Sequence, residues 1–150
     1  MTDPLKTDDP RLIEAEMLAR KIIATQPNNP DALNGLGLIL MERADYAAAE
    51  GYFSQALERE PERQDFSSNL IRALSKAARK AVEAGSPETA MDHLQKSLLI
   101  DPNRVETVCQ MAFVLSSFDR YAEAIEMADK AVSMRSHHAH AHDVRGLALL

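Results

Sequence analysis

The feature that most constrains this chain is a spacing of about 34 residues that recurs between similar positions. Pro27 and Pro61 are separated by this spacing, and each follows an amphipathic segment. Ala90 and Ala124 keep the same distance, whereas the distance from Pro61 to Pro102 is longer by seven residues. One insertion of seven residues explains the longer distance. The chain is therefore interpreted as copies of one unit of this length, one of which is extended.

The same insertion accounts for longer distances along the chain. The distance from Tyr46 to Tyr121 is two periods plus seven residues. The distance from Gly37 to Gly146 is three periods plus the same seven residues. Because one short unit cannot bury its apolar face alone, such a period predicts units that stack on one another.

Within one period, large and small apolar residues follow a fixed order. In residues 30–63 the order is Leu33, Leu36, Gly37, Leu40, Ala49, Phe53, Ala56 and Pro61. This pattern resembles the tetratricopeptide repeat, a helix-turn-helix unit of about 34 residues. The resemblance implies an all-α, right-handed solenoid of antiparallel helix pairs. It also implies that small residues let neighbouring helices approach, so that Phe53 fills the gap between them.

The resemblance divides the chain into a short tail, residues 1–9, and a single repeat domain over residues 10–150. The expected full repeats cover residues 30–63, 64–104 and 105–138, between half repeats at 10–29 and 139–150. The third repeat fits more loosely, with Met111, Ala112, Leu115, Ala124, Ala128 and Ala131 at the small and apolar positions. Ser136 stands where the closing proline would be.

Capping residues and prolines set the boundaries of the expected helices. Asp9 and Ser86 each precede a proline, which combines an N-cap residue with proline at the first helical position. Asp45 and Asp119 are further N-cap candidates. The expected helices cover residues 10–26, 30–42, 46–59, 64–84, 87–100, 105–117 and 121–134, with an eighth beginning near residue 139.

The seven additional residues fall within residues 64–84. Seven residues make two helical turns, so the apolar stripe stays in phase and one long helix is predicted. We expect this helix to project beyond its neighbours. Its exposed Ala and Val side chains would then be either a simple extension or a docking or dimer surface.

Composition excludes several classes of partner. With 17 basic and 23 acidic side chains, the net charge is −6, which disfavours binding to nucleic acid or to anionic membranes. No apolar run approaches the roughly 18 residues of a membrane span, and the first residues do not resemble a signal peptide. The single cysteine, Cys109, cannot form an internal disulfide. The cytoplasm is the expected location.

The resemblance places partner-binding residues on the first helix of each repeat, which lines a concave groove. By register these are Asp31, Asn34, Leu38, Met41 and Glu42, then Asp65, Ser68, Arg72, Ser75 and Lys76, then Glu106, Cys109, Phe113, Ser116 and Ser117, and finally His140, Asp143 and Leu147. Arg72 and Lys76 form a basic middle between apolar positions. A peptide with apolar anchors and a carboxylate would fit. Alternatively, the two cations belong to a solvated face whose ion pairs contribute little.

Some family members grip a C-terminal carboxylate with polar side chains in this groove. Leu38 and Phe113 stand where such side chains would be needed, which argues against chaperone-tail recognition.

Candidates for chemistry are few. His138 and His142, within the cluster His137–His142, are four residues apart and could share a helix face, as zinc ligands do. Without an HExxH motif or a nearby second ligand group, an exposed turn and helix start is favoured, and no metal is expected. Cys109 has no evident His or Asn partner, and phosphate-loop and nucleophile-elbow motifs are lacking. We therefore expect neither catalysis nor a cofactor.

These observations favour a protein–protein interaction scaffold that binds a peptide or protein segment, as the N-terminal module of a larger protein. One alternative is a stand-alone chaperone or adaptor, similar in size to three-repeat chaperones of secreted bacterial proteins. Another is the recognition domain of a glycosyltransferase or sulfotransferase whose catalytic part follows Leu150. Self-association through the terminal half repeat or the extended helix is a further hypothesis.

Overall fold

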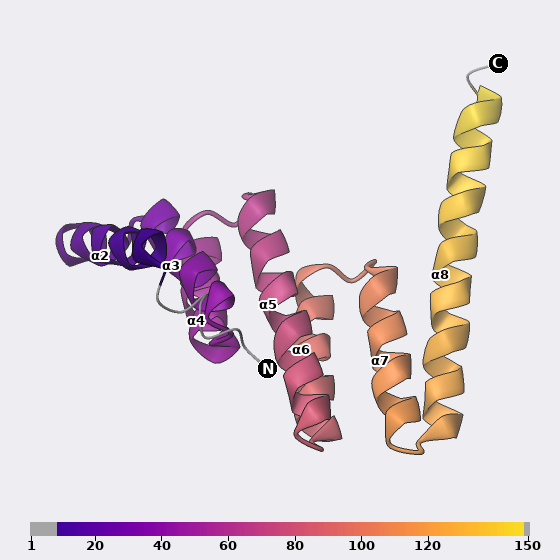
Figure 1. Ribbon diagram of the computed structural model, residues 1–150. Coiled ribbons are helices and arrows are strands. Elements are labelled where there is room, and N and C mark those ends of the chain that lie inside the picture. Colours follow the sequence, from indigo (N-terminus) through magenta and orange to yellow (C-terminus); the bar gives the residue numbers. More distant parts are fainter. Residues whose placement is uncertain (1–8, 149–150) are drawn as a thin grey trace. The chain divides into compact units, whose positions relative to one another are not determined.

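The computed structural model describes the backbone of residues 9–148 and the side chains of residues 9–137. Over residues 9–148 the chain forms seven α-helices and no strand: α2 (Pro10–Thr25), α3 (Pro30–Glu42), α4 (Tyr46–Arg59), α5 (Gln64–Glu83), α6 (Pro87–Ile100), α7 (Val105–Ser117) and α8 (Tyr121–Ala148) (Figure 1). The predicted all-α class is confirmed, and the first six helices have the expected bounds to within one residue. The chain divides within α5, between Ala77 and Ala78, into two compact units.

In the first unit, α3 and α4 form a helix pair and α2 packs on α3. Leu33 of α3, Ala56 of α4 and Phe66 of α5 form a buried cluster, against which Ile23, Tyr52 and Leu57 pack. Burying a Leu or Phe side chain stabilises a fold by about 1.5–3 kcal/mol. The first turns of α5 are thus tied to the pair that precedes them in the sequence.

The close contact between α3 and α4 depends on Gly37. Phe53 of α4 is fully buried. A Cβ atom added to Gly37 would lie 2.6 Å from Cε1 and 2.7 Å from Cδ1 of the Phe53 ring. The glycine therefore leaves the space that the ring occupies, which is the arrangement of large and small residues expected from the repeat.

In the second unit, the end of α5 packs with α6, α7 and α8. The buried cluster contains Ala78, Ala81, Ala90, Leu94, Met111 and Val114, and the partly buried Val82, Met91, Leu98, Phe118 and Met127 pack against it. Ala124 and Ala131, on the inner face of α8, are also buried. Small residues on α5, α6 and α8 and larger ones on α7 therefore share this core.

The extended first helix of the second repeat is confirmed, since α5 has 20 residues whereas α3 and α7 have 13 each. The expectation that its extension would expose Ala and Val side chains is wrong. Ala78 and Ala81 are buried in the cluster with Ala90 and Leu94, and Val82 packs against it. Because two whole turns were added, the apolar stripe of α5 still faces a core.

The turn inside each helix pair has the same structure three times. Ala44, Gly85 and Asp119 adopt positive φ angles of 58°, 77° and 61°. The amide of the next residue donates to the carbonyl five residues earlier, from Asp45 to Leu40 (2.9 Å), from Ser86 to Ala81 (2.8 Å) and from Arg120 to Leu115 (2.9 Å). These are Schellman motifs, which satisfy carbonyls at the helix C-terminus. The first two turns are separated by one period plus the insertion and the last two by one period, so the turns follow the repeat.

This register corrects one predicted cap. Asp119 corresponds to Ala44, not to Asp45, so it is not the N-cap of α8. Its carboxylate instead accepts a hydrogen bond from the Tyr121 hydroxyl at 2.6 Å. Asp9, Asn29 and Asp45 do cap α2, α3 and α4 by accepting from backbone amides at 2.9, 3.0 and 3.2 Å. Ser86 occupies the N-cap position of α6 as expected, but without a side-chain hydrogen bond.

The ends of the second helices explain why α8 is long. Helices α2, α4 and α6 each end two residues before a proline: Pro27, Pro61 and Pro102. The corresponding residue of α8 is Ser136, whose hydroxyl donates to the Val132 carbonyl at 3.0 Å. The helix continues to Ala148 and extends past the first turn of the antiparallel α7 (Figure 1). The expected new helix near residue 139 is therefore wrong, since no proline interrupts the backbone ladder.

Candidate functional site

Expected partner-binding residues on α3 and α5 meet in the first unit. Asn69 Nδ2 donates to Asn34 Oδ1 at 3.0 Å, which connects two side chains that are far apart in the sequence. Arg72 Nη2 in turn donates to Asn69 Oδ1 at 3.4 Å. The first helices of two successive repeats therefore present one continuous polar chain. We call the surface formed by Asn34, Leu38, Met41, Asn69, Arg72 and Lys76 the α3–α5 face.

The α3–α5 face is accessible to a partner. Asn34, Leu38, Met41, Ser75 and Lys76 are partly exposed, and Glu42, Ser68 and Arg72 are exposed. Residues 69, 72 and 76 follow the spacing that places side chains on one helix face. The structure thus brings together the expected residues of α3 and those of the first half of α5.

Asn69 is a residue that the sequence interpretation missed. Its contact with Asn34 exists only because α3 and α5 are neighbours. A signal was nevertheless available, since Asn34 and Asn69 are separated by one period plus one residue. Asn69 therefore follows the expected contact position Ser68 by one place.

The chemistry of this face is that of hydrogen-bond donors. The bond to Asn69 uses an acceptor of Asn34 and leaves the two protons of its own amide nitrogen available to a ligand. Arg72 and Lys76 add a guanidinium and an ammonium group. Carboxylates and peptide carbonyls are the groups that such donors bind, and charge-assisted bonds are the strongest of these.

Two other expected groove residues, Asp31 and Asp65, are bound within the protein. Arg63 contacts Asp31 at 3.1 Å, Asp65 at 2.9 Å and Glu60 at 2.9 Å. Its guanidinium also lies 4.1 Å from the centre of the Phe66 ring. The hydrogen bond from Arg63 lowers the pKa of Asp65. These carboxylates link the start of α3, the end of α4 and the start of α5, so we exclude them from the partner site.

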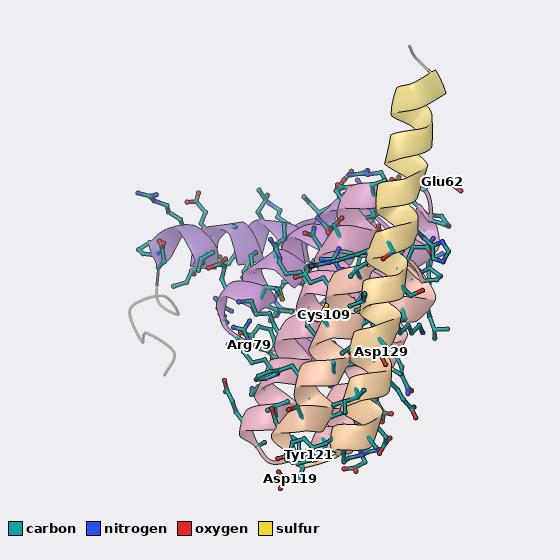
Figure 2. The ribbon with its side chains drawn as sticks, turned by 90° about the vertical axis from the view of Figure 1, so that its right-hand side faces the viewer. Glu62, Arg79, Cys109, Asp119, Tyr121 and Asp129 are labelled. Atoms are coloured by element: carbon teal, nitrogen blue, oxygen red, sulfur yellow. The ribbon has the colours of Figure 1, made fainter. Side chains whose placement is uncertain are left out.

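In the second unit, the expected residues lie on α7. Cys109 and Phe113 are exposed, and Figure 2 shows the position of Cys109 on this helix. Phe113 is 67% exposed, which is a large exposure for an aromatic ring. Glu106 forms an ion pair with Arg104 at 2.8 Å, and Ser116 and Ser117 lie in the last turn of the helix. Phe113 and Cys109, one turn apart, make a separate apolar patch.

The last expected residues, His140, Asp143 and Leu147, have side chains outside the described residues, as do His138 and His142. His137 is exposed. Among the side chains of residues 9–137, no group of three or more His, Cys, Asp or Glu residues could hold a metal ion. Within the described part of the chain, no helix is both long and apolar enough to cross a membrane.

Comparisons with known proteins agree with the repeat. The family model of the tetratricopeptide repeat matches residues 30–63. DnaJ homolog subfamily C member 7 from Mus musculus and its counterpart from Homo sapiens are each 28% identical over 133 residues. These matches cover 83% of this chain and 27% of the relative. The chain therefore spans about a quarter of the length of these relatives.

Two solved structures share the fold. The crystal structure of MamA superposes with a TM-score of 0.55 at 18% identity, covering 83% of this chain and 69% of MamA. YrrB, described as a TPR protein with an unusual peptide-binding site, superposes with a TM-score of 0.53 at 21% identity, covering 87% of this chain and 64% of YrrB. The match at residues 30–63 identifies a tetratricopeptide repeat within the chain, and the two solved structures share its helical fold.

Proposed function

We propose that this chain is a protein-interaction module that binds a peptide segment of a partner on the α3–α5 face. The observation that carries the proposal is the hydrogen-bonded chain Asn34–Asn69–Arg72, which is continued by Lys76. Proteins of this fold generally act as scaffolds without catalysis, and YrrB has a peptide-binding site. The α3–α5 face offers a peptide both hydrogen-bond donors and apolar side chains.

The chemistry of the face selects the peptide. An extended segment would accept hydrogen bonds from Asn34 through its main-chain carbonyl groups. An acidic side chain or a C-terminal carboxylate would pair with Arg72 and Lys76. Leu38 and Met41, both partly exposed, would contact apolar side chains of the same segment. Although the whole chain has a net charge of −6, the six residues that define this face include no carboxylate.

Phe113 is proposed as a second, apolar contact. An aromatic side chain at an interface contributes a large contact area with little loss of conformational entropy. Truncation of Phe113 to alanine should therefore weaken partner binding more than it affects stability.

The length relation to the relatives favours a module within a larger protein. The chain spans about a quarter of the length of DnaJ homolog subfamily C member 7. A glycosyltransferase or sulfotransferase recognition domain and a stand-alone adaptor remain the alternative proposals, and the cytoplasm remains the proposed location. The intact mass of the native gene product distinguishes a module of a larger protein from a stand-alone adaptor.

The experiment that tests the proposal is selection from a random peptide library displayed on phage, followed by fluorescence anisotropy with a selected peptide. We expect enrichment in Asp and Glu, and at least tenfold weaker binding by the double variant Arg72→Glu with Lys76→Glu. The matched control is Arg59→Glu with Lys96→Glu, which makes the same charge change on second helices. Unchanged affinity in the first variant, or equal loss in both, would overturn the assignment of the face.

A further inference from the structure

The side-chain amides of Asn34 and Asn69, both partly buried, are joined to Arg72 by two hydrogen bonds. Asn69 Nδ2 donates to Asn34 Oδ1 at 3.0 Å, and Arg72 Nη2 donates to Asn69 Oδ1 at 3.4 Å. All three residues lie in the first unit, which ends at Ala77. The two bonds run in one direction, from the guanidinium on α5 to the amide on α3.

Arg72 determines which way the Asn69 amide points. A carboxamide can turn either its accepting oxygen or its donating nitrogen to a neighbour, whereas a guanidinium has only N–H donors and no acceptor. If the Asn69 amide were rotated by half a turn, its NH2 group would face the guanidinium, donor against donor. The guanidinium therefore keeps the Asn69 oxygen on its own side and the NH2 group on the side of Asn34.

The orientation of Asn69 in turn determines that of Asn34. The NH2 group of Asn69 needs an acceptor, and the Asn34 oxygen supplies it at 3.0 Å. Because this oxygen is used inside the protein, the NH2 group of Asn34 points away from Asn69. A partner group that binds the Asn34 amide must then be an acceptor.

This chain of bonds belongs to one junction between repeats. By the repeat register, Asn34 corresponds to Cys109 of α7, which has no amide. Arg72 corresponds to Leu38 of α3 and to Phe113 of α7, which have no donors on their side chains. The other repeats form their helix pairs without these groups, which favours a role in selecting a partner over a role in packing.

We propose that Asn69 is a positioning residue that, held by Arg72, makes the Asn34 side chain a hydrogen-bond donor to the partner. This role depends on the proposed function, since it requires that a peptide lies on the α3–α5 face. It adds the chemical class of the group bound at Asn34, which is an oxygen acceptor and not an N–H group. Arg72 thus acts twice, by pairing with an acidic side chain and by orienting two amides.

Asn69→Asp should reverse the direction of the chain. A carboxylate accepts from Arg72 but has no proton to donate, so the NH2 group of Asn34 would turn towards residue 69 and its oxygen towards the partner. The affinity for the acidic peptide selected from the phage library should fall about tenfold or more, because an acceptor would then face an acceptor. Asn69→Ala leaves the Asn34 amide free to rotate and should lower the affinity about threefold.

The matched control is Ser67→Asp, which adds the same charge to α5. Ser67 lies about 200° around the helix from Asn69, and its hydroxyl donates to the Gln64 carbonyl at 3.0 Å. This variant should change the affinity by less than about twofold. Equal losses in Asn69→Asp and Ser67→Asp would overturn the proposal, because charge alone would then explain both.

Nuclear magnetic resonance of the isotope-labelled chain of residues 1–150 tests the orientation without a peptide. The NH2 protons of Asn69 should exchange with water more slowly than those of Asn34, because only the former are bonded within the protein. Arg72→Met should abolish this difference, and circular dichroism verifies that the variant folds. Faster exchange at Asn69 than at Asn34, or a difference that persists in Arg72→Met, overturns the proposal.

The two measurements separate this role of Asn69 from the proposed function. Failure to select any peptide would overturn the proposed function. A selected peptide whose affinity is unchanged by Asn69→Ala would overturn only the positioning role, and the α3–α5 face would remain the binding surface.

Discussion

The first and third repeats share the turn between their two helices and differ in their interiors. In the first, Gly37 leaves space for the fully buried ring of Phe53. In the third, the corresponding residues are Ala112 and Ala128, and Ala128 is exposed. Both repeats nevertheless contain the same left-handed turn, at Ala44 and at Asp119.

The helix ends also follow the repeat pattern more fully in the first repeat than in the third. The first repeat has side-chain caps at Asn29 and Asp45. In the third repeat, Arg104 precedes α7 without a capping hydrogen bond, and Ser136 replaces the proline that follows α4. The comparison teaches that the turn and a few small residues maintain the hairpin, whereas the aromatic ring and the caps are additions that one repeat can lack. The family model accordingly matches the first repeat.

The largest expected effect comes from removing the ring. Phe53→Ala should lower the free energy of unfolding by about 3–5 kcal/mol, because it leaves a cavity between α3 and α4. Phe113→Ala in the third repeat is the matched control, and it should change stability by no more than about 0.5 kcal/mol since that ring is exposed. Urea denaturation measures both. A loss below about 1 kcal/mol for Phe53→Ala would contradict the packing described for the first repeat.

The next effect isolates the space beside the ring. Gly37→Ala should destabilise the protein by about 1–3 kcal/mol, because its Cβ atom would overlap the Phe53 ring. Gly35→Ala on the same helix meets no atom within 4 Å and should stabilise by up to about 1 kcal/mol through helix propensity. Thermal unfolding of the two variants should therefore shift in opposite directions. A higher unfolding temperature for both variants would mean that helix propensity outweighs the contact with Phe53.

The shared turn predicts effects of opposite sign at equivalent positions. Ala44→Gly should stabilise by about 1 kcal/mol, because a left-handed φ strains residues that have a Cβ atom. Gly85→Ala should destabilise by a similar amount for the same reason. Chemical denaturation of both variants measures the cost of this turn in two repeats. A neutral or destabilising effect of Ala44→Gly would show that the positive φ angle at residue 44 carries no strain.

The smallest effects concern the caps. Asn29→Ala and Asp45→Ala should each cost about 1 kcal/mol, since each removes a hydrogen bond to a helix N-terminus. Ser86→Ala should cost only a few tenths of a kcal/mol, because Ser86 makes no such bond. Equal losses at Asp45 and Ser86 would show that the geometric difference between these caps has no energetic counterpart.

Most of the fold could be predicted from the sequence because the period is carried by local signals. The prolines after α2, α4 and α6 and the small residues on each helix are visible without any tertiary contact. The incorrect predictions concern helix ends at which a single residue departs from the repeat pattern. Ser136 does not end a helix, and Asp119 occupies the turn position of Ala44 rather than the cap position of Asp45.

The candidate site was harder to predict, because its members are defined by neighbours from another repeat. Whether Asp65 is available to a ligand depends on Arg63, which binds it together with Asp31. Whether Asn69 belongs to the site depends on Asn34, across two helices. The register predicts which helix faces a partner could use, and the hydrogen bonds show which of their side chains are already bound within the protein.

The length of α5 has a consequence for how such a chain can change over generations. Seven residues turn a helix through about 700°, only about 20° short of two full turns. Ala78 and Ala81 therefore still point into a core. An insertion of five residues would rotate them by about 140° and direct them towards water. Gene variants that lengthen this helix should thus survive selection in steps of about two turns, which makes helix length a discrete rather than a continuous trait.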